Sequence, residues 1–360
     1  LVNARSEETE RINGLLALQG KQGSGVPKLI AGDIGAVAKL KASRTGDSLV
    51  AKERYLNLAW PAVPAAAMSF AIEPKAKGDE EKIGDALARL IEEDPSLQTA
   101  RDPQTGEFLL SGTAQLHVEI AVSRLKNRSN VEVVLHPPRV PYRETILRPA
   151  EGHGRHKKQT GGRGQFADCK IKIEPLDRGL DFEFVDEIFG GAIPQNFRPA
   201  VEKGIQEARV RGFLSGNPMV DFRVRLIDGQ FHDVDSSELA FKIAGSLAYK
   251  DAMEKASPVI LEPIMKVEVI TGEEFMGDIM SDLSQRRGRP QGMDTRGHQQ
   301  VVKALVPMAE MLNYAAALRA MTQGRSDFNM EFSHYEEAPR HVQEKIIADA
   351  ARQKKEEAEG

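Results

Sequence analysis

The sequence has little cysteine, few aromatic residues and no long apolar run. One of its 360 residues is cysteine (Cys169), one is tryptophan (Trp60), and aromatic residues make up 6%. A single cysteine excludes an intrachain disulfide and a thiolate metal cluster, and it favours a reducing compartment. No apolar run reaches the ~18–20 residues that cross a bilayer, and no signal peptide is visible. We therefore expect a cytoplasmic protein with no membrane partner.

The chain also lacks an overall positive charge. Its formal net charge is −4 and its pI is about 6.1, which argues against a general nucleic-acid coat protein. The positive charge is local instead, because residues 139–174 hold nine Lys and Arg against four Asp and Glu. Hydrophobic residues at 41% and charged residues at 28% are typical of a globular protein. At 360 residues, two to four domains of roughly 100–200 residues are expected.

The most informative stretch is GHGRHKKQTGGRGQ, residues 152–165, which has five glycines and no acid. Strand-like sequence lies on both sides, so the stretch reads as a loop that projects cations and leaves its backbone open to phosphates. The alternative is a solvated hairpin tip. The end of this stretch is formed by Gln159, Thr160, Gly161, Gly162, Arg163, Gly164 and Gln165, and it follows a basic patch of Arg155, Lys157 and Lys158.

A second stretch, DGQFHDVDSSE at residues 228–238, carries Phe231, His232 and Asp233 just before a predicted helix. An aromatic ring and an imidazole at a turn can stack on an unpaired base and bond to it. The alternative is a hairpin whose phenylalanine packs inward. We predict that this turn and the glycine-bearing turn lie at one end of one elongated domain. Asp235 and Glu238 resemble a capping box for the helix that follows.

A third basic stretch follows a predicted helix near Gln285. It contains four arginines that could contact RNA phosphates, although cations at a helix C-terminus also serve the helix dipole. These are Arg286, Arg287, Arg289 and Arg296. No phosphate-binding loop, nucleophile elbow or metal-ligand spacing is present, so no catalytic residue, metal or cofactor is predicted within these residues.

Two segments share the predicted order βαββαβ, and a different α+β domain separates them. In the first, a helix over 113–129 is expected to turn Leu116, Ile120 and Leu125 inward; in the second, helical methionines are expected to fill the core. The predicted fold class is α+β and multidomain. The predicted parts are a partial β-barrel (1–60), a ferredoxin-like domain (61–138), an elongated domain (139–260), a second ferredoxin-like domain (261–338) and a polar helical tail (339–360).

These features together resemble the rear half of elongation factor G. The resemblance covers nearly all of residues 1–338, in order. It rests on AGDIGAVAKL (31–40), TGDSL (45–49), AIEPKAKGDEEKI (71–83), DPS (94–96), SGTAQLHVEI (111–120), PYRETI (141–146), KKQTGGRGQF (157–166), PQNFRPAVEKGIQEA (194–208), FHDVDSSELAFKIAGSLA (231–248), FMGDIMSDLSQRRG (275–288), RGHQQVVKALVP (296–307) and TQGR (322–325).

The resemblance implies a multidomain GTPase that binds both ribosomal subunits and moves transfer RNA and messenger RNA after peptide-bond formation. The elongated domain would imitate an anticodon arm and enter the decoding region. The resemblance assigns its RNA contacts there to Gln159–Gln165 and Phe231–Asp233, with His232 as the apical residue. GTP and Mg²⁺ would belong to a GTPase domain outside these residues, so we expect a fragment of a longer, monomeric protein. Two alternatives remain: a paralogue that acts in ribosome recycling or rescue, and a metabolic enzyme built from two split-βαβ domains.

Overall fold

The computed structural model describes residues 1–53, 56–60, 63, 66, 68–76, 78, 80–102, 105–159, 164–297 and 299–359. The chain divides into two compact units, Leu1–Pro138 and Arg139–Gly360. No helix in these described ranges is long and apolar enough to span a membrane.

The first unit begins with four short strands and no closed barrel among the described residues of 1–60. The strands pair as two separate antiparallel ribbons: β1 (Val2–Asn3) with β4 (Leu49–Val50), and β2 (Leu15–Gln19) with β3 (Gln22–Val26). A buried carboxylate stabilises this segment, because Glu10 accepts hydrogen bonds from the backbone of Lys41, Ala42 and Ser43.

The rest of the first unit has the element order βαββαβ and an antiparallel sheet in the order β6-β7-β5-β8. Its elements are β5 (Met68–Pro74), α1 (Glu80–Glu93), β6 (Gln98–Arg101), β7 (Phe108–Gly112), α2 (Gln115–Ser129) and β8 (Val133–His136). One prediction for α2 was wrong. Leu125 is buried, but Leu116 and Ile120 are exposed, because the core-facing stripe runs through Val118, Ala121 and Leu125. Asp79, which precedes α1 and is a residue type suited to a helix N-cap, lies outside the described residues.

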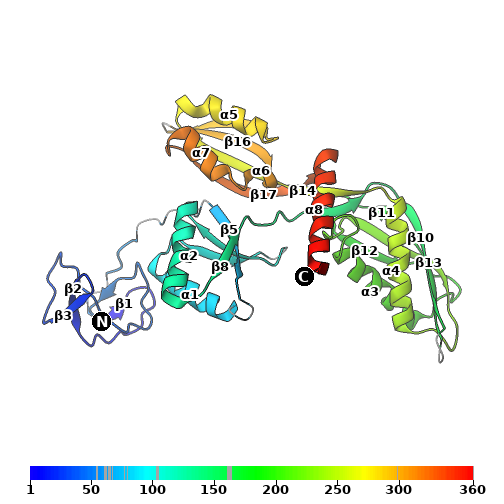
Figure 1. Cartoon of the computed structure of the whole chain (residues 1–360), viewed down its shortest axis with the longest axis horizontal. Helices are drawn as coiled ribbons and strands as arrows, with labels where there is room; N and C mark the ends of the chain where they lie inside the picture. The colour runs from blue at the N-terminus through cyan, green and yellow to red at the C-terminus, as the bar shows by residue number, and fades with distance from the viewer. Residues whose placement is uncertain are drawn as a thin grey trace. The chain divides into compact units, whose positions relative to one another are not determined.

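The second unit opens with a four-stranded sheet backed by two helices (Figure 1). The sheet order is β10-β11-β13-β12, with β12 parallel to β13 across the α3 crossover and the other pairs antiparallel. The elements are β10 (Ala150–Lys158), β11 (Gln165–Pro175), β12 (Phe182–Asp186), η1 (Gln195–Phe197), α3 (Arg198–Val210), β13 (Phe222–Gln230) and α4 (Glu238–Lys255).

Helix α4 lies directly on β10 because β10 has glycine where the two meet. A Cβ on Gly154 would stand 2.0 Å from the carbonyl oxygen of Ala244, and one on Gly152 would stand 2.1 Å from that of Ala248. This corrects the reading of residues 152–158 as part of a loop. They form a strand, and these two glycines allow close helix–sheet packing rather than the approach of a phosphate.

A long strand, β14 (Pro258–Thr271), leads into a second sheet of order β15-β16-β14-β17. Its first residues pair with β9 (Arg143–Ile146) and its later ones with β16 and β17, so the predicted boundary at residue 260 falls inside one continuous strand. The other elements are η2 (Glu273–Phe275), α5 (Met276–Gln285), β15 (Arg289–Arg296), β16 (Gln299–Pro307), α6 (Met308–Met311), α7 (Tyr314–Thr322), β17 (Asp327–Glu337) and α8 (Arg340–Glu359).

The core of this second sheet contains the predicted methionines. Met311 is buried, and Met276, Met280, Met308 and Met321 pack partly buried against the same cluster. Two short helices, α6 and α7, follow Pro307 and are separated by Leu312 and Asn313. The tail is helical, as predicted, and its first turn is anchored. Gln343 accepts a hydrogen bond from the amide of Ile260 and donates one to the carbonyl of Ala338.

Candidate nucleic-acid interface

The first predicted contact loop closes the β10–β11 hairpin. Lys158 lies opposite Gln165 in the last paired register position. Gln159 is exposed and Gly164 is half-buried. The remaining predicted contacts of this loop lie outside the described residues: Thr160, Gly161, Gly162 and Arg163.

The second predicted loop joins the end of β13 to the start of α4. Phe231, His232 and Asp233 are all exposed, with Phe231 at 40%. The helix begins at Glu238, and its N-cap is Ser237, whose Oγ accepts a hydrogen bond from the amide of Ala240 at 3.2 Å. The predicted capping box of Asp235 and Glu238 is therefore wrong: the cap lies two residues later, so Asp235 remains within the turn.

The two loops meet at the same end of the sheet. The amide of Phe166 donates to the carbonyl of Asp235 at 2.9 Å, and Ser236 Oγ donates to the carbonyl of Phe166 at 2.8 Å. Gly164 lies against the same turn, since a Cβ on it would stand 3.0 Å from the Asp235 carboxylate. The structure thus brings together the glycine-bearing loop and the Phe-His loop. Ser236 and Phe166, which join them, had no distinguishing signal in the sequence.

The imidazole of His232 is oriented by its own turn. Its Nδ1 accepts long hydrogen bonds, both 3.3 Å, from the amides of Val234 and Asp235. Its side chain is 58% exposed, and no hydrogen bond within the described residues engages Nε2. An Nδ1 that accepts leaves the ring proton on Nε2. His232 therefore presents an N–H donor to the solvent, suited to a phosphate oxygen or a base acceptor.

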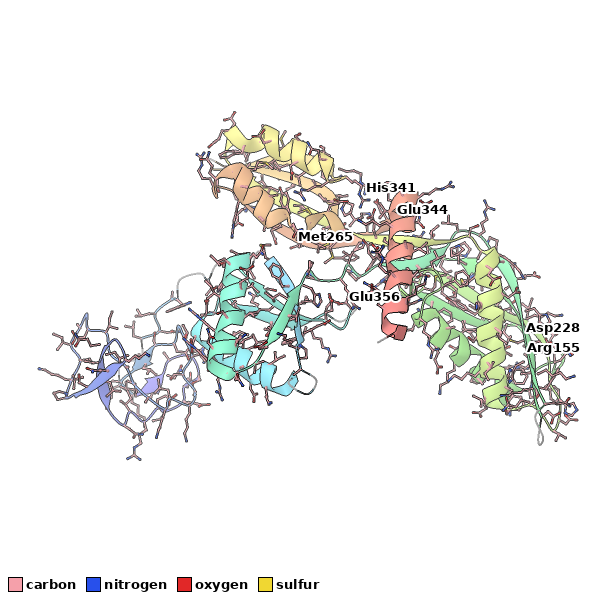
Figure 2. The ribbon with its side chains drawn as sticks, viewed as in Figure 1. Arg155, Asp228, Met265, His341, Glu344 and Glu356 are labelled. Atoms are coloured by element: carbon pink, nitrogen blue, oxygen red, sulfur yellow. The ribbon has the colours of Figure 1, made fainter. Side chains whose placement is uncertain are left out.

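The basic patch lies on the last residues of β10. Arg155 is 3.8 Å from the Asp168 carboxylate and stands over the Phe166 ring, on the face of the sheet away from α4 (Figure 2). Lys157 and Lys158 are exposed, and no ion pair reaches either of them in the part of the chain that the structure describes. Two cations without a carboxylate partner make this end of the hairpin attractive to polyanions.

Farther from the loops, the same sheet face is neutralised by ion pairs. Lys170 pairs with Asp228 at 2.9 Å, Arg223 with Glu183 at 2.7 Å, and Arg225 with Glu174 at 3.0 Å. The Lys170 ammonium group lowers the pKa of the Asp228 carboxyl below its usual range. The pKa of the Glu174 carboxyl is lowered too, first by the Lys172 ammonium group and then by Arg225. On this sheet face, Lys170, Arg223 and Arg225 are thus matched by carboxylates, in contrast to Lys157 at the loop end.

The third basic stretch divides into half-buried and exposed arginines. Arg287 makes a bidentate pair with the buried Glu262 at 2.7 and 2.8 Å, and Arg286 donates to Asp282 and to the carbonyl of Glu310. Arg289 pairs with Glu336, yet its side chain is 53% exposed. Arg296 lies at the end of the fully exposed β15. Arg286 and Arg287 therefore hold this domain together, and only Arg289 and Arg296 present cations at the surface.

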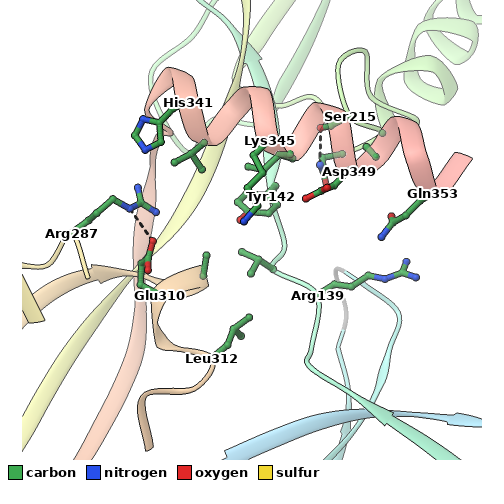
Figure 3. A pocket seen from close by; sticks show the side chains of 17 residues that line it. Arg139, Tyr142, Ser215, Arg287, Glu310, Leu312, His341, Lys345, Asp349 and Gln353 are labelled. Carbon is green, nitrogen blue, oxygen red and sulfur yellow. Dashed lines mark hydrogen bonds and ion pairs between the residues drawn. The ribbon is translucent and has the colours of Figure 1, made fainter. Parts of the chain in front are cut away.

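A cavity of about 730 Å³ lies where α8 passes over the β9 and α6 segments. His341, Lys345, Asp349 and Gln353 face it from successive turns of α8, and Arg287 with Glu310 closes one side (Figure 3). Its charges are mixed in sign, and the described residues contain no group of three or more His, Cys, Asp or Glu side chains that could hold a metal. The cavity therefore differs from the loop end, where the cations are unpaired.

Comparisons with known proteins agree with this arrangement. The chain matches three domain families: "Elongation Factor G, domain III" over residues 63–137, "Elongation factor G, domain IV" over 138–257 and "Elongation factor G C-terminus" over 259–346. It is 49% identical over 348 residues to elongation factor G of Aquifex pyrophilus, covering 96% of this chain and 50% of that protein. A crystal structure of a Thermus thermophilus protein superposes with a TM-score of 0.76 at 41% identity, covering 94% of this chain and 51% of the other.

The chain spans about half the length of these relatives, and the two contact loops fall within the region that matches domain IV. The matches run in the same order as the domains of that family and together account for most of the chain. The chain belongs to the elongation factor G family.

Proposed function

We propose that this chain is the ribosome-binding part of an elongation factor G-type GTPase that promotes translocation of transfer RNA and messenger RNA. One observation carries the proposal: the amide of Phe166 and the carbonyl of Asp235 join two loops into one exposed surface. That surface presents the Nε2–H of His232 beside the unpaired ammonium groups of Lys157 and Lys158. Such a surface fits RNA, in which phosphates attract cations and unpaired bases accept hydrogen bonds.

The proposed mechanism is steric and electrostatic. The sheet of β10, β11 and β13, backed by α4, would act as a stiff wedge whose loop end enters the decoding region. RNA phosphates would neutralise Lys157 and Lys158 there, while His232 supports the codon–anticodon region as the subunits relax. The exposed Arg289 and Arg296 would contact ribosomal RNA of the large subunit.

Nucleotide chemistry belongs to another part of the full-length protein under this proposal. GTP and Mg²⁺ would be bound there, and hydrolysis would give the movement its direction. The full-length protein would work as a monomer in the cytoplasm.

The experiment compares two activities of the full-length protein. We expect His232→Ala, or Lys157→Glu with Lys158→Glu, to slow translocation about tenfold or more, since each removes a hydrogen bond or contact to a charged group. Ribosome-stimulated GTP hydrolysis should stay near the wild-type rate. A matched double reversal, Lys203→Glu with Lys250→Glu on α3 and α4, changes charge equally away from the loops and should leave translocation unaffected.

Equal loss of both activities in the loop variants would contradict the proposal, because the residues would then act through folding or docking. Normal translocation combined with slower subunit splitting would instead assign the chain to ribosome recycling.

A further inference from the structure

Ser236 is buried between the two contact loops, although both of its neighbours in the turn are more exposed. Its Oγ accepts a hydrogen bond from the amide of His232 at 2.9 Å and donates one to the carbonyl of Phe166 at 2.8 Å. Its own amide donates to the carbonyl of His232 at 3.0 Å. One hydroxyl therefore joins the Phe-His loop to the start of β11, as an acceptor toward the loop and a donor toward the strand.

We propose that Ser236 is a positioning residue that fixes His232 against the glycine-bearing loop, so that the two loops meet RNA as one surface. This inference rests on the proposed function for its biological consequence, but its structural content can be tested separately. Ser236 touches no RNA itself. It acts by fixing the backbone from which the His232 ring projects.

The surrounding contacts restrict the movement of the turn that carries His232. The Phe166 amide is bonded to the Asp235 carbonyl, and the Asp235 carboxylate lies against the backbone of Gly164. If the Ser236 hydroxyl is removed, the amide of His232 and the carbonyl of Phe166 each lose a partner. The bond between Phe166 and Asp235 still joins the turn to the start of β11, but the two polar groups left unpaired favour opening toward water.

The neighbouring serine provides a matched control. Ser237 Oγ accepts from the amide of Ala240 and caps α4, but it makes no hydrogen bond to the β10–β11 loop in the described structure. Ser236→Ala and Ser237→Ala therefore remove the same atom one residue apart. The first opens the bridge between the loops, and the second weakens the first turn of the helix.

The first test measures amide hydrogen exchange in the whole chain. We expect Ser236→Ala to speed exchange at the amides of His232 and Phe166 about tenfold, which corresponds to the loss of one hydrogen bond. Ser237→Ala should speed exchange at Ala240 and leave His232 and Phe166 unchanged. Unchanged exchange at both amides in Ser236→Ala would overturn the bridge, and so would equal acceleration of both by Ser237→Ala.

The second test uses the full-length protein and a double-mutant cycle with His232→Ala. If Ser236 acts through His232, Ser236→Ala slows translocation several-fold in the wild-type background and has no further effect beside His232→Ala. Additive losses would overturn the positioning role. Should His232→Ala alone leave translocation unchanged, the proposed function fails, and the exchange experiment still decides whether the bridge exists.

Discussion

Gly154 and Cys169 are opposed residues of β10 and β11, and both face the helix α4. Gly154 has no room for a side chain, and Cys169 is fully buried. Burial raises the pKa of the Cys169 thiol to about 12, so the thiolate needed for reaction with a disulfide reagent is scarce at neutral pH. The rate at which a reagent labels this thiol, the only one in the sequence, therefore measures how often α4 separates from the sheet.

Gly154→Ala should destabilise this module by about 1–3 kcal/mol or more, because a methyl group would push the Ala244 carbonyl away from the strand. We expect faster labelling of Cys169 by a thiol reagent and a lower urea midpoint. Gly277→Ala is the control, since Gly277 is exposed in α5 and a Cβ there meets no atom within 4 Å. Labelling at the wild-type rate in Gly154→Ala would contradict the close contact.

Arg287→Ala should cost about 3–5 kcal/mol, because it leaves the buried Glu262 carboxylate without a partner. Arg289→Ala breaks an exposed pair with Glu336 and should cost about 1 kcal/mol or less. Urea unfolding, monitored by circular dichroism, measures the loss of stability in each of the two variants. Similar small losses for both variants would mean that Arg287 is available to RNA after all.

The segment formed by residues 1–60 should lose stability in acid. The Arg5 guanidinium, helped by Asn3 and the amide of Arg44, holds the pKa of the Asp47 carboxyl far below its usual range. Because the pKa of Asp47 is lower in the folded state than in the unfolded chain, its carboxylate stabilises the folded state fully above about pH 4, the pKa of an unfolded aspartate. This stabilisation is lost progressively as the pH falls from there toward the pKa of Asp47 in the folded state.

Trp60, the only tryptophan, provides the signal for this change. Its ring would stand 2.9 Å from a Cβ on Gly46, next to Asp47. We expect its fluorescence to change as the pH falls below about 4, and Asp47→Asn to produce that change already at neutral pH. The exposed Glu53 supplies the control variant Glu53→Gln, for which the wild-type pH profile is expected. A flat profile for the wild type would rule out this role for Asp47.

Ribosome binding by the full-length protein should weaken steeply with salt. Replacing Lys157 and Lys158 with glutamine should reduce the slope of log K against log[salt] by roughly 1.4–1.8, since each of the two phosphate contacts contributes about 0.7–0.9. Lys203→Gln with Lys250→Gln should leave the slope unchanged. Binding titrations at four or five salt concentrations are sufficient, and an unaltered slope in the loop variant would place the RNA contacts elsewhere.

The sequence predicted the broad architecture well because that architecture depends on periodicity. The split-βαβ order, the methionine core and the α+β class all follow from apolar spacing and turn residues. The α2 prediction failed in detail. Leu116, Ile120 and Val118 are all apolar, and only the tertiary contacts decide which of them face the core.

The candidate site was partly predictable for a different reason. Charge and turn chemistry identified Lys157, Lys158 and His232, because exposed cations and a turn histidine are visible in a single sequence. Nothing local distinguished Ser236 from Ser237, since both suit a helix cap and only the position of Phe166 separates their roles. The glycines of β10 were misread because a bare backbone can face a helix as readily as a phosphate.

The continuous strand β14 limits where two homologues can be joined in a chimera. Its first residues are held by β9 and its later ones by β16 and β17. A chimera joined near residue 260 would take the two halves of this shared strand from different homologues, so the side chains that pack across the join would no longer match. The second unit, Arg139–Gly360, should therefore be exchanged between homologues as one cassette, and a swap of residues 139–260 alone should lower the free energy of unfolding.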